Sequence, residues 1–175
     1  MTRPEGKARA VVVMGVSGSG KTSVGEAVAA SLGLPFVEGD GLHPAANVEK
    51  MSKGIPLTDE DRMPWLDLIG ETICASLTCG EGVVLSCSAL KRAYRDRLRR
   101  AAGGGLSFVY LHGTRELLAR RMGERKGHFM PASLLESQLA TLEDPTGEPG
   151  VVTVDIDGSV EAIAEKAVRG LASAA

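Results

Sequence analysis

Five short apolar runs recur along the chain, and stretches with the spacing of amphipathic helices separate them. Each run is nearly continuous in apolar residues, which is typical of strands that are buried on both faces of a parallel sheet. The predicted strands are Ala10–Met14, Pro35–Glu38, Val83–Cys87, Leu106–Leu111 and Val151–Ile156.

The intervening helical patterns complete an alternation of strand and helix. They predict helices over Lys21–Leu32, Ala45–Met51, Trp65–Leu77, Lys91–Ala102, Arg115–Glu124, Ala132–Leu142 and Val160–Ala172. This order predicts an α/β fold with three layers, in which one parallel sheet lies between helices. Right-handed crossovers bring the carboxyl ends of the strands to one edge, where ligands bind. We expect that edge to carry Gly15–Thr22, Asp40, Ser86–Leu90 and Gly113.

A phosphate-binding motif follows the first apolar run directly. Residues 15–22 have the sequence GVSGSGKT, which is the P-loop pattern G-x-x-x-x-G-K-T between a strand and a helix. Backbone N–H groups of such a loop bind phosphate oxygens, and the positive end of the next helix adds to the attraction. We expect Lys21 to reach the β- and γ-phosphates and the Thr22 hydroxyl to bind Mg²⁺. The predicted nucleotide-binding residues are Gly15, Ser17, Gly18, Ser19, Gly20, Lys21, Thr22 and Ser23.

Composition narrows the class of protein. A chain of 175 residues with 43% hydrophobic residues and a mean hydropathy of +0.03 fits one globular domain over residues 1–175. No apolar run approaches the roughly 20 residues of a membrane span, and the net charge of −2 gives no general case for nucleic acid or membranes as partners. Three cysteines are too few for a disulfide framework, and no signal peptide is evident, so we expect a cytoplasmic protein.

Asp40 is a candidate for the chemistry because it follows the second predicted strand, between Gly39 and Gly41. A carboxylate at that edge lies near the P-loop, where it can hold Mg²⁺, accept the proton of an attacking hydroxyl, or do both. The third strand ends without the acidic residue that often helps to hold Mg²⁺ there, which makes Asp40 more important for that role. In isolation it would be an ordinary turn residue.

Two polar patterns come next. His43, Asn47 and Lys50 share one helix face, which can line a pocket for a polyhydroxylated substrate or face water. Thr58 and the acids after it are typical of a helix start, which leaves Arg62 unexplained. An arginine there can bind a substrate carboxylate with two hydrogen bonds.

Two basic segments allow several interpretations. Residues 91–100 contain six basic residues and can form a solvated helix surface, a nucleic-acid patch, or a site where only Lys91 and Arg95 meet an anionic substrate. Cations between Arg120 and His128 predict a lid over about residues 120–131 that closes on the triphosphate and excludes water. The simpler interpretation is an exposed basic helix end.

Several segments together resemble the gluconate kinases of the P-loop small-molecule kinase group. The resemblance runs from about Val11 to Asp157, and its specific parts are Leu42-His43-Pro44, Cys87-Ser88-Ala89-Leu90-Lys91 and Arg125-Lys126-Gly127-His128-Phe129. It implies ATP-dependent phosphorylation of D-gluconate at the C6 hydroxyl. It also implies Mg²⁺, a five-stranded sheet of order 2-3-1-4-5, and a homodimer.

The resemblance also assigns roles to residues. Lys21, Asp40 and Arg125 are the expected catalytic residues, Thr22 and Asp40 the expected metal ligands, and Arg121 is expected to pack on adenine. The expected gluconate-binding residues are Asp40, His43, Asn47, Arg62, Lys91, Arg95 and His128. Which cation meets the substrate carboxylate stays open at this point.

Two alternatives compete with this hypothesis. Shikimate kinases share the P-loop, but they have D-x-D after the second strand and a glycine pair after the third, where this chain has Glu38-Gly39-Asp40 and Ser86-Cys87-Ser88. The other alternative is a non-enzymatic, nucleotide-dependent binding protein that uses the basic helix over residues 91–100. It predicts ATP binding without turnover and a salt-dependent affinity for nucleic acid.

Overall fold

A computed structural model describes residues 9–124 and 132–173. Its centre is a five-stranded parallel sheet of order β2-β3-β1-β4-β5, which confirms the predicted fold class and strand order. The strands are β1 (Ala10–Met14), β2 (Phe36–Glu38), β3 (Val83–Ser86), β4 (Leu106–His112) and β5 (Val151–Asp155).

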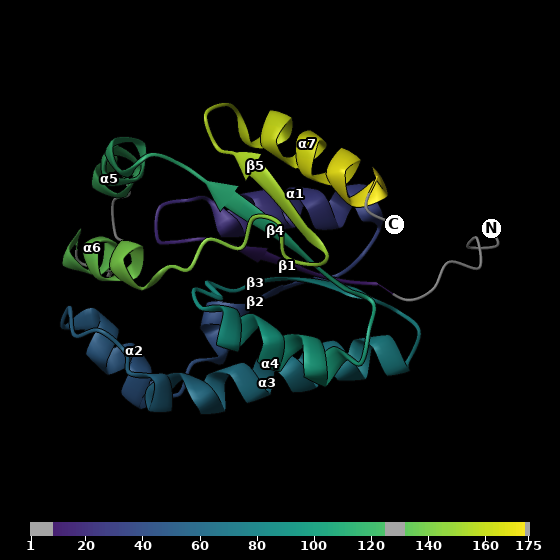
Figure 1. Cartoon of the computed structure of the whole chain (residues 1–175), viewed down its shortest axis with the longest axis horizontal. Coiled ribbons are helices and arrows are strands. Elements are labelled where there is room, and N and C mark those ends of the chain that lie inside the picture. The colour runs from purple at the N-terminus through teal and green to yellow at the C-terminus, as the bar shows by residue number, and fades with distance from the viewer. Residues whose placement is uncertain (1–8, 125–131, 174–175) are drawn as a thin grey trace.

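Helices cover both faces of the sheet and gather at one end of it (Figure 1). The pair α1 (Lys21–Leu32) and α7 (Val160–Ser173) packs on one face, and the pair α3 (Asp59–Thr78) and α4 (Arg92–Ala102) packs on the other. Near the carboxyl ends of the strands lie α2 (Ala45–Ser52), α5 (Arg115–Glu124) and α6 (Ala132–Thr141). This arrangement places the last three helices beside the predicted ligand edge.

The core lies on both sides of the central strand. All five residues of β1 are fully buried between β3 and β4, since helices cover the sheet above and below. The continuous apolar composition of the strands is therefore explained by their position in the middle layer. No helix within the described part of the chain is long and apolar enough to cross a membrane.

Two local differences from the predicted elements concern the candidate site. Helix α3 begins at Asp59, which confirms the helix start predicted at Thr58 and extends the helix predicted over Trp65–Leu77. Thr58 and Asp61 form a reciprocal capping box, and Pro64 is accommodated inside the helix. A short 3₁₀ helix, η1 (Gly39–Leu42), carries Asp40, where only a turn was predicted. Both differences add ordered backbone around the residues that follow β2.

Candidate active site

The phosphate loop joins β1 to α1 and is held by its own backbone and side chains. The Ser19 N–H and hydroxyl both donate to the Val16 carbonyl, at 3.2 and 2.7 Å, and Lys21 Nζ donates to the same oxygen at 3.2 Å. Gly18 has a φ of +86°, and a Cβ there would lie 3.0 Å from the Leu118 carbonyl of α5. The loop therefore has the glycine-dependent shape that the motif predicts.

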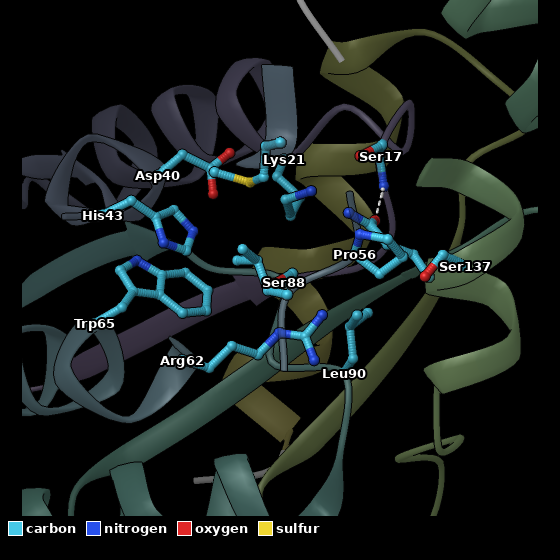
Figure 2. Close-up of a pocket in the computed structure, with 13 residues that line it drawn as sticks. Ser17, Lys21, Asp40, His43, Pro56, Arg62, Trp65, Ser88, Leu90 and Ser137 are labelled. Atoms are coloured by element: carbon cyan, nitrogen blue, oxygen red, sulfur yellow. Dashed lines mark hydrogen bonds between the residues drawn. The ribbon is translucent and has the colours of Figure 1, made fainter. Parts of the chain in front are cut away.

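A pocket opens beside this loop and brings together residues from distant parts of the sequence (Figure 2). The predicted residues that line it are Ser17, Lys21, Asp40, His43 and Arg62. Ser88, which belongs to the predicted ligand edge, lines it too, as do residues that the sequence analysis did not assign, among them Trp65 and Gln138. The structure thus places the P-loop lysine, a carboxylate, an imidazole and a guanidinium around one cavity.

Asp40 owes its position to the residues around Gly39. The Gly39 N–H donates to Ser86 Oγ at 3.2 Å, and the Trp65 indole N–H donates to the Gly39 carbonyl at 2.8 Å. A Cβ on Gly39 would lie 1.9 Å from the Ser86 carbonyl oxygen, whereas one on Gly41 would meet nothing within 4 Å. Glycine is therefore needed at position 39, where the backbone approaches β3 closely, and is not needed for space at position 41.

His43 is held in one orientation at the pocket wall. Its ring stacks on Trp65 with centroids 4.0 Å apart, and Asn47 Nδ2 lies 3.2 Å from its Nδ1 and 2.8 Å from the Asp61 carbonyl. Since a carbonyl only accepts, the Asn47 atom between them is the amide nitrogen, so Nδ1 accepts and Nε2 carries the proton. Burial lowers the pKa of His43 to about 4, with Asp40 opposing that shift and Arg62 adding to it. His43 is therefore a neutral hydrogen-bond donor at neutral pH.

Asn47 itself is 3% exposed and is absent from the pocket lining. Both of its amide hydrogens are used within the protein, by His43 and by Asp61. The structure therefore makes Asn47 a residue that orients His43, in place of the direct substrate contact predicted from the sequence.

Arg62 is a buried cation that faces the pocket. Its side chain is 8% exposed, and its guanidinium donates to Tyr94 Oη at 2.9 Å and lies over the Tyr94 ring. Tyr94 in turn donates to Asp59. Within residues 9–124 and 132–173, no carboxylate forms an ion pair with Arg62. A buried guanidinium without a protein counter-ion is well suited to bind an anionic group of a ligand.

Lys91 lies at the same corner but is absent from the pocket lining. Its ammonium pairs with Asp59 at 3.0 Å and lies near the Tyr94 ring. Its pKa is raised, chiefly by the hydrogen bond to Asp59. Lys91 therefore adds positive charge behind Arg62 and does not face the cavity directly.

The structure does not bring Arg95, a predicted substrate-binding cation, to the pocket lining. Its side chain is 0% exposed and pairs with Glu148 at 2.6 Å, while its other donors bind the carbonyls of Ala89 and Glu143. All three guanidinium nitrogens donate to groups of the protein. Arg95 supports from behind the segment after β3, where Ala89 has a left-handed φ of +45° and its neighbours Ser88 and Leu90 line the pocket.

The basic helix α4 is largely neutralised within the fold. Five of the six cations of residues 91–100 pair with carboxylates. The five are Lys91, Arg92, Arg95, Arg97 and Arg99. Most of these pairs join the helix and its first flanking residue to α3 and to the loop before β5. The positive charge of this segment is therefore balanced within the protein, and no external polyanion is needed to explain it.

Glu38 is an acidic neighbour of the phosphate loop that the sequence analysis did not assign to the site. Its carboxylate accepts a hydrogen bond from the Thr22 hydroxyl at 2.6 Å. The two oxygens lie at the helix start where a P-loop hydroxyl binds a metal, and Asp40 follows two residues later. The described residues hold no cluster of three metal-binding side chains. This sparse oxygen set fits Mg²⁺, which keeps several water and phosphate ligands.

The remaining predicted residues are distributed as follows. Arg121 on α5 donates to the Ile156 carbonyl, just after β5, at 2.6 Å. Ser23 is exposed on α1, one residue beyond Thr22. Arg125, His128 and most of the predicted lid lie outside the described residues. Among the site residues that the sequence analysis missed, Trp65 would have been the easiest to find, as it is the one tryptophan of the chain.

Known proteins match this chain over nearly its whole length. A family model described as an AAA domain matches residues 11–145. A gluconokinase from Gluconobacter oxydans is 51% identical over 93% of this chain and 91% of its own length. A thermosensitive gluconokinase from Escherichia coli is 45% identical over 89% of this chain and 83% of its own.

A solved structure gives the same result in three dimensions. The crystal structure of a gluconokinase from Sinorhizobium meliloti is 58% identical and covers 95% of this chain and 93% of that one, with a TM-score of 0.88. Identity at this level, together with the P-loop and the pocket, fixes the family. The chain belongs to the gluconokinase family of P-loop proteins.

Proposed function

We propose that this protein is a gluconokinase, which transfers the γ-phosphoryl group of ATP to the C6 hydroxyl of D-gluconate. Its close similarity to gluconokinases supports this activity. The observation that carries the proposal within the structure is Arg62, a buried cation without a carboxylate partner among the described residues, on the wall of the pocket that holds Lys21 and Asp40.

We assign the substrate carboxylate to Arg62 because the other two candidate cations are engaged elsewhere in the protein. Lys91 is paired with Asp59, and Arg95 is enclosed by Glu148 and backbone carbonyls. The Arg62 guanidinium has donors left after its one hydrogen bond to a described residue, Tyr94. A carboxylate bound there directs the rest of the sugar acid along the pocket, past the neutral Nε2–H of His43 and towards Asp40.

Asp40 and Lys21 then carry the transfer. Asp40 accepts the proton of the C6 hydroxyl as that oxygen forms its bond to the γ-phosphorus. The bond from the γ-phosphorus to the bridging oxygen breaks, and ADP leaves. Lys21 stabilises the charge on the transferred group, because its ammonium belongs to the phosphate loop and faces the same pocket.

Further features belong to this proposal. Thr22 and Asp40, joined by Glu38, would hold Mg²⁺, which when bound neutralises charge on the triphosphate. Arg121 contacts adenine, and a lid over about residues 120–131 brings Arg125 to the transferred phosphoryl group and His128 to the substrate. The enzyme acts as a cytoplasmic homodimer. The family resemblance supports these assignments.

An ADP-release assay tests the activity. Purified protein with ATP and Mg²⁺ is offered gluconate, shikimate, glycerate and hexoses in separate reactions. We expect saturable ADP formation with gluconate and rates near the ATP-only blank with the others. A gluconate rate no higher than that blank contradicts the proposed function. Turnover with shikimate alone would support the competing kinase class.

A further inference from the structure

A tyrosine hydroxyl connects Arg62 to the helix behind it. Tyr94, in the first turn of α4, is 1% exposed and is absent from the pocket lining, whereas Arg62, in the first turn of α3, faces the pocket (Figure 2). Arg62 Nη1 donates to Tyr94 Oη at 2.9 Å, and Tyr94 Oη is itself hydrogen-bonded to Asp59. Asp59 and Arg62 lie about one turn apart on α3, so the hydroxyl of α4 bridges two side chains of the neighbouring helix.

The direction of each hydrogen bond follows from the chemistry of the groups. A guanidinium only donates and a carboxylate only accepts, so the single phenol proton goes to Asp59 and the phenol oxygen accepts from Arg62. Burial raises the pKa of Tyr94, and the hydrogen bond to Asp59 raises it as well, so the phenol keeps its proton at neutral pH. The hydroxyl therefore faces Arg62 as a fixed, neutral acceptor.

Asp59 completes this arrangement without neutralising Arg62. Its carboxylate pairs with Lys91 at 3.0 Å, and it reaches the Arg62 guanidinium only through the Tyr94 hydroxyl. A direct ion pair between Asp59 and Arg62 would occupy the charge and the donors that an anionic ligand needs. The phenol between them holds the cation and leaves its charge available to the pocket.

Holding the guanidinium in advance favours ligand binding. An arginine side chain has many rotamers, and ordering it at the moment of binding costs affinity. The hydrogen bond from Arg62 and the position of its guanidinium 5.4 Å from the centre of the Tyr94 ring order the side chain beforehand. The contribution of Tyr94 should therefore appear in the affinity for the ligand of Arg62.

We propose that Tyr94 is a positioning residue for recognition of the substrate carboxylate, which holds the Arg62 guanidinium at the pocket wall without neutralising it. The inference rests on the proposed function, because it takes the gluconate carboxylate as the ligand of Arg62. Tyr94 acts only through Arg62, since it is absent from the pocket lining. Its loss should therefore weaken the recognition of gluconate and leave the binding of ATP and the transfer step intact.

The first test compares wild-type protein with Tyr94→Phe, which keeps the buried ring and removes only the hydroxyl. Initial rates are measured with gluconate varied at saturating ATP and with ATP varied at saturating gluconate. We expect the KM for gluconate to rise about three- to tenfold, which is the size of one lost hydrogen bond, while kcat and the KM for ATP stay within twofold.

The matched control is Tyr110→Phe. Tyr110 is the other tyrosine of the chain, and it is buried in β4 and absent from the pocket lining. Loss of its hydroxyl should leave kcat and both Michaelis constants within twofold of wild type.

A double-mutant cycle with Arg62→Met shows whether Tyr94 acts through Arg62. The protein that carries both Arg62→Met and Tyr94→Phe should have a gluconate KM within twofold of Arg62→Met alone, because the hydroxyl then has no guanidinium to hold. A merely structural role would instead multiply the two effects, or raise both Michaelis constants of Tyr94→Phe together. Either result, or an unchanged gluconate KM in Tyr94→Phe, overturns the inference.

The same measurements separate this inference from the proposed function. Gluconate turnover by the wild type supports the function whatever the Tyr94 variants show. A raised gluconate KM in Arg62→Met with an unchanged one in Tyr94→Phe overturns the positioning role alone. An unchanged gluconate KM in both variants removes the carboxylate site and the inference together, while wild-type turnover still supports gluconokinase activity.

Discussion

The phosphate side and the acceptor side of the pocket are built in opposite ways. On the phosphate side, one continuous segment from Gly15 to Thr22 supplies backbone N–H groups, and its glycines permit the loop conformation. On the acceptor side, Asp40, His43, Arg62 and Ser88 come from η1, the turn before α2, the first turn of α3 and the segment after β3. The first is a property of local backbone, and the second exists only after the chain has folded.

This difference determines what a substitution does on each side. A backbone cradle depends on conformation, and it binds the phosphates common to all nucleoside triphosphates. A set of convergent side chains depends on residue identity, and it selects one acceptor by its charge and hydroxyl groups. Replacements on the acceptor side should therefore separate chemistry, carboxylate recognition and stability from one another.

The largest effect is expected for Asp40→Asn. Loss of the carboxylate removes the proton acceptor for the attacking hydroxyl, so kcat should fall about 10²- to 10⁴-fold. The KM for ATP should rise far less than kcat falls, because the phosphate loop and Thr22 are untouched and only one proposed Mg²⁺ ligand is lost. Steady-state kinetics with both substrates varied provide the measurement.

A matched control for Asp40→Asn is Asp67→Asn. Asp67 is an exposed acid on α3 that pairs with Arg97 and is absent from the pocket lining, so its loss should leave kcat within twofold. Full turnover of Asp40→Asn at saturating gluconate would remove the catalytic role assigned to Asp40.

Arg62→Met should damage recognition of gluconate instead of chemistry. The loss of a charged hydrogen-bonding partner costs about 2–3 kcal/mol, which corresponds to an increase of about 30- to 150-fold in the KM for gluconate. The KM for ATP should remain close to the wild-type value. Initial-rate measurements at saturating ATP give the gluconate KM.

Arg97→Met is the control for loss of an arginine, because Arg97 is only partly buried and pairs with Asp67. Its gluconate KM should stay unchanged. An equal rise in both Michaelis constants of Arg62→Met would indicate a general disturbance of the pocket and would argue against a carboxylate site.

The same difference explains how much the sequence predicted. The five strands and the phosphate loop were predicted because they depend on local patterns and on one contiguous motif, whereas the strand order came from the family resemblance. The site was predicted less completely, since spacing brought Arg95 and Arg62 forward as equivalent cations. Only burial and partners separate them, as Arg95 is enclosed by Glu148 and carbonyls while Arg62 faces the cavity. Gln138 was missed as a site residue because its contact with Ser17 crosses 121 positions.

Gly39→Ala should destabilise the acceptor side without touching a polar side chain. The new Cβ would lie 1.9 Å from the Ser86 carbonyl, so β3 and η1 would have to separate. We expect a loss of about 2–3 kcal/mol in the free energy of unfolding, measured by chemical denaturation. Gly41→Ala is the matched control, because its Cβ meets nothing within 4 Å. Equal stability of the two variants would contradict the close approach of Gly39 to β3.

The smallest effect concerns the pH dependence of His43. Its pKa is about 4 in the folded protein and about 6.5 when unfolded, so between those values the unfolded chain binds the proton more readily. The free energy of unfolding should therefore fall as the pH is lowered from 6.5 to 4, by about 1–3 kcal/mol from this residue.

Other groups titrate in the same range, so the measured quantity is the difference in the free energy of unfolding between wild type and His43→Gln at each pH. That difference should shrink at acidic pH, because the neutral variant lacks this dependence while Asp40 and Arg62 remain in both proteins. A constant difference across the range would show that His43 is not held neutral by burial. The acceptor side would then lack the fixed donor that distinguishes it from the phosphate side.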